Sequence, residues 1–327
     1  MMAAVPTSTT PGAAPARPRG ARGALRRLTP ARVLFFLIFL GVPLAIYVVF
    51  VVSPFLQAFY YSLTDWRGLS RAPQFIGLEN YVTLFHDPVF LKALRNNLIL
   101  LVTLPLITIT LAFTLAVLVT VGGDSRGAIR GVPGATVYRV VSFFPYAIPA
   151  VVVGILFAFV YSPNGGLLNG LLQAVGLDVS IGWLGERRFA MAAIIAAVVW
   201  SLVGFYMVLF VAAIKSIPSE VVEAARIDGA GRLRLAVQVV LPMVRGNVST
   251  AAVYMGIMAL DMFVFVNVMT PTGGTGKSTE VVSRYLYETA FSESRFGLAS
   301  AMGVVMALLT MAMAVLVLVI SRGKDEA

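Results

Sequence analysis

The sequence predicts an all-α integral membrane protein with six transmembrane helices. Of its 327 residues 59% are hydrophobic and only 12% are charged, whereas soluble domains carry about 25% charged residues. Six apolar segments reach the roughly 20 residues that a helix needs to cross a bilayer. Of the forty charged side chains, thirty-nine lie outside these segments, and the exception is Asp261. The expected spans are 33–52, 98–121, 140–161, 189–214, 248–270 and 298–320.

The two chain ends are expected to be short polar tails. Residues 1–32 are rich in Ala, Pro, Thr and Arg, a composition that cannot build a core, and predict a disordered cytoplasmic tail. No small-residue cleavage site follows the first apolar segment, so we expect a retained span and not a signal peptide. Residues 321–327 are expected to form a cytoplasmic C-terminus.

Several expected spans contain proline within the apolar run. Membrane helices tolerate proline where neighbouring groups satisfy the freed carbonyls. We therefore expect kinks or re-entry points in three of the spans. The prolines concerned are Pro43, Pro105, Pro145 and Pro149.

The distribution of basic residues predicts the orientation of the spans. With a cytoplasmic N-terminus, sixteen Lys and Arg residues lie inside and nine outside, which agrees with the excess of basic residues in cytoplasmic loops. Both termini are then cytoplasmic. Residues 53–97, 162–188 and 271–297 form external segments. The net charge of +10 is explained by topology, and nucleic-acid binding is not expected.

The cytoplasmic loop 215–245 has the pattern of a structured element. Ser219 is a candidate N-cap, and Glu223 places negative charge near the same positive helix end. Gly229 is expected to end that helix, and Leu241-Pro242 to mark a turn before the chain returns to the bilayer. A helix at this position indicates a docking element for a soluble partner.

The sequence offers no pattern that indicates an enzyme. The loop 273–278 looks like a phosphate-binding loop, but the glycine required five positions before Gly276 is Pro271. His86 is the only histidine and has no second metal ligand nearby, and the chain has no cysteine. We therefore expect no cofactor, no metal site and no catalytic residue in this chain.

Asp261 is the charged residue expected within the bilayer, about 21 Å into its span and in the outer half. Because a charge there is unfavourable by about 3 kcal/mol, the side chain should face a partner, a cavity or a pathway. Three roles fit: a hydrogen bond that holds the helix bundle, the lining of a polar substrate route, or proton coupling. Tyr254 and Asn267 are weaker candidates for the same pathway.

Within the cytoplasmic loop, one spacing resembles a known family signature. The pattern is EAA, three residues, Gly, nine residues, a branched apolar residue, one residue and Leu-Pro. It resembles the signature of bacterial ATP-binding-cassette (ABC) importer permeases, which usually have isoleucine where this chain has Val239. The matching residues are Glu223, Ala224, Ala225, Gly229, Val239, Leu241 and Pro242.

The resemblance covers roughly residues 33–320. Residues 64–66 and 75–81 look like the first external segment of carbohydrate permeases of the maltose, lactose and glycerol-phosphate group. Asp261 with residues 270–274 and 278–280 resembles the fifth span of that group and the loop that follows it.

The resemblance implies a six-span permease of type I ABC importer architecture, in a bacterial cell membrane, that imports sugar. The helix around 219–231 would couple it to a dimer of cytoplasmic ATPase subunits, which use ATP-Mg. A second homologous permease and an extracytoplasmic sugar-binding protein would complete the transporter. The alternative is an ion-coupled secondary transporter of a small polar solute, although only Asp261 offers intramembrane charge and no repeat of broken helices is evident.

Overall fold

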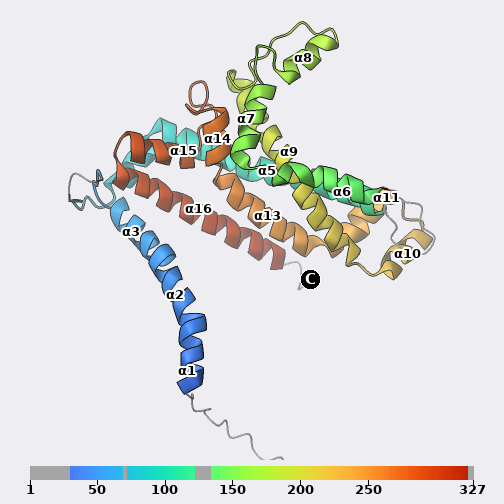
Figure 1. Cartoon of the computed structure of the whole chain (residues 1–327), viewed down its shortest axis with the longest axis horizontal. Helices are drawn as coiled ribbons and strands as arrows, with labels where there is room; N and C mark the ends of the chain where they lie inside the picture. Colours follow the sequence, from blue (N-terminus) through green and yellow to red (C-terminus); the bar gives the residue numbers. More distant parts are fainter. Residues whose placement is uncertain (1–29, 69–71, 122–133, 323–327) are drawn as a thin grey trace, which may run out of the picture. The chain divides into compact units, whose positions relative to one another are not determined.

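A computed structural model of the chain describes residues 30–68, 72–121 and 134–322 (Figure 1). The described residues are almost entirely helical, and the one β feature among them is an isolated bridge between Thr64 and Phe75. Residues 1–54 and 55–327 form two compact units. Most of the tail expected at 1–32, and most of the expected C-terminus 321–327, fall outside the described residues.

In the first unit, the described residues form a single helical run. It consists of α1 (Pro30–Phe36), a π-helical turn (Leu37–Gly41), α2 (Val42–Tyr47) and a second π-helical turn (Val48–Val52). The run continues into α3 (Ser53–Ser62). Exposed apolar side chains cover all sides of the helix, as expected for a membrane helix. Pro43 lies just after the first π-helical turn, and it does not interrupt the helical run.

Three long helices form the frame of the second unit. They are α5 (Pro88–Val121), α9 (Arg187–Lys215) and α16 (Phe296–Arg322), and α4 (Glu79–His86) precedes the first of them. Figure 1 shows α5 and α9 side by side, with α13 (Arg245–Leu260) against both α5 and α16. The core between these helices is apolar. It includes Leu100, Leu104, Ile194, Phe210 and Met255.

Two of the expected spans are broken helices. Ala135–Phe143 (α6) leads through a 3-10 turn (Phe144–Ala147) into α7 (Ala150–Val160), with a bend of 97°. Pro145 lies in that turn, and Pro149 is the N-cap of α7, so the kink expected from these prolines is confirmed. The second pair is α13 and α14 (Phe263–Met269), which meet at 45°. This second break contains no proline.

The helices confirm the predicted fold class. Among the described residues, four helices are long and apolar enough to cross a membrane, and six spans result if each bent pair counts as one. The four are Leu34–Ser62, Pro88–Val121, Arg187–Lys215 and Phe296–Val317. The described helices therefore supply one candidate for each of the six predicted spans.

Close contact between α6 and α9 depends on Gly204. A Cβ atom there would lie 1.7 Å from the carbonyl oxygen of Ser142, so only glycine allows the two backbones to approach this closely. Small residues at such contacts are typical of packed membrane helices. Gly204 thus fixes the first half of the broken span against the central helix.

The loop 215–245 is helical over most of its length. Ser219–Ile227 form α10, and Gly229 adopts φ +80° where the chain breaks. The next helical run comprises α11 (Arg232–Arg234), a π-helical turn (Leu235–Val240) and α12 (Leu241–Met243). The helix and the glycine break predicted here are confirmed.

Two local predictions in this loop are wrong. Ser219 is not the N-cap: Pro218 takes that position with ψ 133°, so Ser219 is the first helical residue and makes no capping bond. Leu241-Pro242 do not form a turn, because both lie inside the helical run, which continues from the π-helical turn through α12 with Val240 and Leu241 in the αR conformation. The chain turns instead at Val244 (φ −101°, ψ 12°).

The remaining helices belong to the segments expected outside the membrane. Leu167–Ala174 form α8, and Val282–Tyr287 form α15, which continues into a π-helical turn (Glu288–Ser292). The glycine-rich segment 271–281 joins α14 to α15 without regular structure.

Candidate functional site

Helix α10 is attached to the core by one of its faces. Val222 is 1% exposed and belongs to the same apolar cluster as Val121 at the end of α5. One turn later, the Arg226 guanidinium donates a hydrogen bond to the main-chain carbonyl of Val121 (3.3 Å). Residues four apart lie on the same helix face, so this face of α10 is held by the burial of Val222 in the core and by the bond from Arg226 to α5.

The opposite face of α10 and the start of α11 are exposed and partly apolar. Ile227 is 86% exposed and Leu233 is 78% exposed. Of the two signature alanines, Ala224 is exposed, whereas Ala225 packs against the core of the chain itself. Glu223 is half-buried at the edge of this face.

The other signature residues take different positions in the loop. Gly229 is exposed at the break after α10. Leu241 is half-buried and Pro242 is exposed in α12. Ile227 and Leu233, both apolar and exposed, are not part of the signature. In the sequence, the only indication of them is that they lie close to signature residues.

Asp261 lies at the break between α13 and α14. It is the C-cap of α13, and its main-chain N–H donates to the carbonyls of Ile257 and Met258. Its carboxylate is exposed and has no hydrogen-bond or ion-pair partner among the described residues. With Ser283 and Thr310 it lines a cavity of about 230 Å³ between α13, α15 and α16. The Ser283 hydroxyl is itself buried without a partner.

An exposed polar stripe runs along α13 toward Asp261. Asn247, Thr250 and Tyr254 are exposed, Tyr254 by 66%. Along the series Asn247, Thr250, Tyr254 and Asp261, neighbouring members are three, four and seven residues apart. This spacing places all four residues on one helix face. Sequence reasoning found Tyr254 and Asp261 but missed Asn247 and Thr250, which the helical period could have identified. Asn267, the third candidate, is half-buried on α14.

The two broken spans meet at a second hollow of about 380 Å³. Its lining includes Tyr146 from the turn between α6 and α7, Ser201 from α9, Met258 from α13 and Phe265 from α14. Asp261, Tyr254 and Asn267 do not line it, so the structure does not unite the three sequence candidates there. Non-helical backbone at membrane depth is tolerated where it lines a cavity or is buried in protein.

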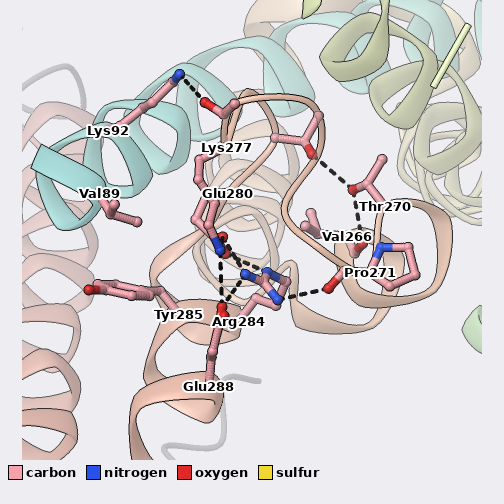
Figure 2. A network of polar contacts seen from close by, with 12 residues as sticks. Val89, Lys92, Val266, Thr270, Pro271, Lys277, Glu280, Arg284, Tyr285 and Glu288 are labelled. Atoms are coloured by element: carbon pink, nitrogen blue, oxygen red, sulfur yellow. Dashed lines mark hydrogen bonds and ion pairs between the residues drawn. The ribbon is translucent and has the colours of Figure 1, made fainter. Parts of the chain in front are cut away.

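A buried ionic network holds parts of the segment 271–288 together (Figure 2). Glu280 is fully buried. Its carboxylate accepts hydrogen bonds from Arg284 and forms an ion pair with Lys277 (3.1 Å). Glu288 binds the same two cations, and Arg284 also donates to the carbonyl of Pro271 (2.8 Å). Burial acts to raise the pKa of Glu288, but the hydrogen bond from Lys277 and the charge of Arg284 hold it below the ordinary value.

The same network explains the segment that resembles a phosphate loop. Gly273, Gly274 and Gly276 all have positive φ, as their turns require. Lys277, which would bind phosphate in a nucleotide site, is engaged by two carboxylates. Its position is that of a structural cation. Among the described residues, no three His, Cys, Asp or Glu side chains come together to hold a metal.

Two adjacent asparagines on α5 hold this segment and the helix break together. Asn96 donates to the carbonyl of Glu280 (2.8 Å). Asn97, fully buried, donates to the carbonyl of Leu260 (3.0 Å) and accepts from the N–H of Val282 (2.9 Å). The carbonyl freed at the end of α13 is therefore satisfied by a side chain from α5, as a broken membrane helix requires.

The comparisons with known proteins identify the family. Residues 127–325 match the family of binding-protein-dependent transport system inner membrane components. The diacetylchitobiose uptake system permease protein NgcF of Streptomyces coelicolor is 50% identical over 97% of this chain and 91% of its own length. The chain belongs to this permease family. The probable ABC transporter permease protein YurN of Bacillus subtilis is 37% identical over 87% of this chain and 96% of its own length.

Solved structures give the same fold. A bacterial ABC transporter involved in import of the acidic polysaccharide alginate has a chain that matches with a TM-score of 0.75. It shares 21% identity and covers 89% of the permease and 96% of that chain. Another structure, of an alginate ABC transporter in complex with a pentasaccharide-bound periplasmic protein, matches with a TM-score of 0.67, 23% identity and coverage of 88% and 90%. The predicted ABC importer permease architecture is confirmed.

Family membership decides between the two transport classes that the sequence left open. The permease is an integral membrane subunit of an ABC transporter and not an enzyme in its own right. The ion-coupled secondary transporter kept as the alternative does not fit a chain of this family.

Proposed function

We propose that this permease forms half of the pathway of an ATP-driven sugar importer, beside a second homologous permease. The observation that carries the substrate class is the 50% identity over 97% of the chain with a permease named for diacetylchitobiose uptake. An N-acetylated amino disaccharide is therefore the first substrate to try. A substrate of this kind is uncharged and rich in hydroxyl and amide groups.

The coupling element is the loop 215–245, and within it α10. Its outer face, with Glu223, Ala224 and Ile227, would seat in a groove of a cytoplasmic ATPase subunit that binds and hydrolyses ATP-Mg. Exposed apolar side chains beside a charged residue suit such a contact. The inner face, held by Val222 and Arg226, would carry the movement of the ATPase subunits into the membrane helices.

The pathway lies along the polar face of α13. A carboxylate turned to lipid is unfavourable by about 3 kcal/mol, and Asp261 has no partner among the described residues that would offset this. The stripe of Asn247, Thr250, Tyr254 and Asp261 would therefore face the second permease and the substrate route between the two chains. Asp261 and Tyr254 could hydrogen-bond sugar hydroxyls, while Asn267 stands further along the same broken span.

The external segments would receive sugar from an extracytoplasmic binding protein. The excess of basic residues in the loops assigned to the inside supports cytoplasmic termini in a bacterial plasma membrane. With that orientation, the segment 271–288 is external, and its ionic network makes it a fixed surface. A rigid surface loses little conformational entropy when a partner docks.

The partners are tested by purification of the permease from its native membrane in mild detergent, with mass spectrometry of what accompanies it. Wild type should bring an ATPase and a second permease, and Glu223→Arg should lose the ATPase alone. Asp178→Arg reverses an exposed charge in an external segment and should retain both. Recovery of the ATPase with Glu223→Arg at the wild-type level would reject the coupling role of α10.

A further inference from the structure

We propose that Arg226 and Asn97 are positioning residues for transport, each fixing a functional element to one end of helix α5. Arg226 ties α10 to the carboxyl end of α5, and Asn97 ties the break between α13 and α14 to the other part of α5. Movement of α10 is thereby passed along α5 to the broken span. The inference rests on the proposed coupling role of α10.

The bond at the carboxyl end joins parts of the chain 105 residues apart in sequence. The last four carbonyls of any helix lack intrahelical partners, and a cation is favourable beside them. Arg226 supplies both the donor and the positive charge. The contact is reinforced by burial, because Val121 and Val222 are 2% and 1% exposed. A displacement of α10 therefore acts on α5 through this charged hydrogen bond.

Near the other end of α5, the side-chain amide of Asn97 forms hydrogen bonds with two helix termini. Its Nδ2 donates to Leu260, the last residue of α13, and its Oδ1 accepts from Val282, the first residue of α15. Both termini lack intrahelical partners for these groups. The side chain is fully buried, so water cannot replace it. The break beside Asp261 thus keeps its position relative to α5 through Asn97.

The helix between the two contacts is suited to move as one piece. From Asn97 to Val121 it runs 24 residues, about 36 Å at 1.5 Å per residue. Leu100, Leu104 and Ala112 are fully buried along its length. Pro105 removes one backbone hydrogen bond, but the helix continues without a break. A continuous packed helix can carry coupling between sites at this separation.

The test uses a reporter at the helix break. The chain has no cysteine, so Ile257→Cys adds a single thiol one turn before Asp261. The complex purified with this chain is reconstituted in proteoliposomes, and a membrane-impermeant maleimide labels the thiol with ADP or with ATP and vanadate. In a complex with wild-type Arg226, the labelling rate should differ between the two nucleotide states.

Arg226→Ala should reduce that difference by about fivefold to tenfold, a usual size for coupling between sites. The amount of ATPase recovered with the complex should stay at the level seen with Arg226. Arg226→Lys, which keeps a charged donor, should restore part of the difference. Lys215→Ala removes an exposed charge at the end of α9, outside the proposed docking face, and is the matched control, expected to behave as the parent does.

Asn97→Asp keeps the acceptor for Val282 and removes the donor to Leu260. It should reduce the nucleotide-dependent difference as Arg226→Ala does, and the double variant should be little worse than either alone, because both act on one element. If Asn97→Asp does not fold, the inference is tested by the Arg226 variants alone. Recovery and thermal stability of each complex identify that case.

Two results would overturn the inference. In one, Arg226→Ala leaves the nucleotide-dependent labelling unchanged. In the other, Arg226→Ala loses the ATPase, which would mean that Arg226 only shapes the docking surface. Failure of the proposed function is recognised separately, since the parent complex would then lack an ATPase or show no nucleotide-dependent labelling, and this inference would fall with it.

Discussion

The guanidinium of Arg284 binds the carboxylate of Glu280, four residues earlier in the chain, and both groups are buried. Figure 2 shows how Lys277 and Glu288 complete the network around this pair. Two cations and two carboxylates balance, so the segment between α14 and α15 is held without net charge. This arrangement leads to the first two predictions.

Removal of Arg284 should destabilise the permease more than removal of the pair. Arg284→Met leaves the two carboxylates of Glu280 and Glu288 with the single cation Lys277, and removal of one partner from a buried ion pair is unfavourable by about 3 kcal/mol or more. Arg284→Met with Glu280→Gln should recover much of that loss. Thermal unfolding of the purified complex in detergent measures both. Equal losses from the single and double variants would show that the pair is not the stabilising element.

The network should also weaken in acid through Glu288. Because its pKa is lowered in the folded chain, the stabilisation from Glu288 is complete above its ordinary value of 4.5 and is lost as pH falls below that value through the folded pKa. The melting temperature of wild type should therefore drop below about pH 4.5, and the drop should be smaller in Glu288→Gln. Identical pH profiles would contradict this assignment.

Gly204 should not tolerate a side chain. Gly204→Ala places a methyl group 1.7 Å from the Ser142 carbonyl, so α6 must separate from α9. We expect loss of folded permease, or a melting temperature lower by several degrees, since overpacking is unfavourable by about 1–3 kcal/mol. Gly246→Ala, where a Cβ meets nothing within 4 Å, is the control and should behave as wild type.

The exposed side chain of Ile227 should contribute strongly to ATPase binding. Ile227→Glu puts a charge in the centre of the proposed contact, and loss of a central contact of about 2 kcal/mol lowers affinity about thirtyfold. ATPase recovered by affinity purification reports the effect. Leu177→Glu makes the same kind of change at an exposed external position and should leave recovery unchanged. Full recovery with Ile227→Glu would move the docking surface elsewhere.

Asp261 should be needed for transport and not for folding. Asp261→Asn removes the charge, and loss of a hydrogen bond to a charged group is worth about a tenfold change or more. Sugar uptake should therefore fall while the melting temperature stays unchanged, because the carboxylate has no partner among the described residues. A lowered melting temperature with normal uptake would support the alternative in which Asp261 holds the bundle.

Much of the helical framework could be predicted from the sequence, because span length and polarity are local properties. The kink at Pro145 and Pro149 was predicted for the same reason. The break at Asp261 was not, since it contains no proline and depends on Asn97, 163 residues away. Pro242 does not mark a turn, because the helical run continues through it after the π-helical turn Leu235–Val240.

The candidate site was predictable only in part. The signature located α10 and Gly229, but it could not show that Ala225 packs inward or that Ile227 is the exposed residue. Those facts depend on how α10 rests on α5, through the contact between Arg226 and Val121. Tertiary contacts between distant segments leave no local pattern in one sequence.

Coupling of an ATPase to sugar movement through α10 can be measured as uptake of radiolabelled diacetylchitobiose into proteoliposomes that hold the native complex, with binding protein outside and ATP-Mg inside. We predict uptake that requires ATP, resists collapse of proton and sodium gradients, and is lost in Glu223→Arg. Uptake that needs no ATP and follows an ion gradient, or that is unchanged in Glu223→Arg, would show that α10 does not couple an ATPase to transport.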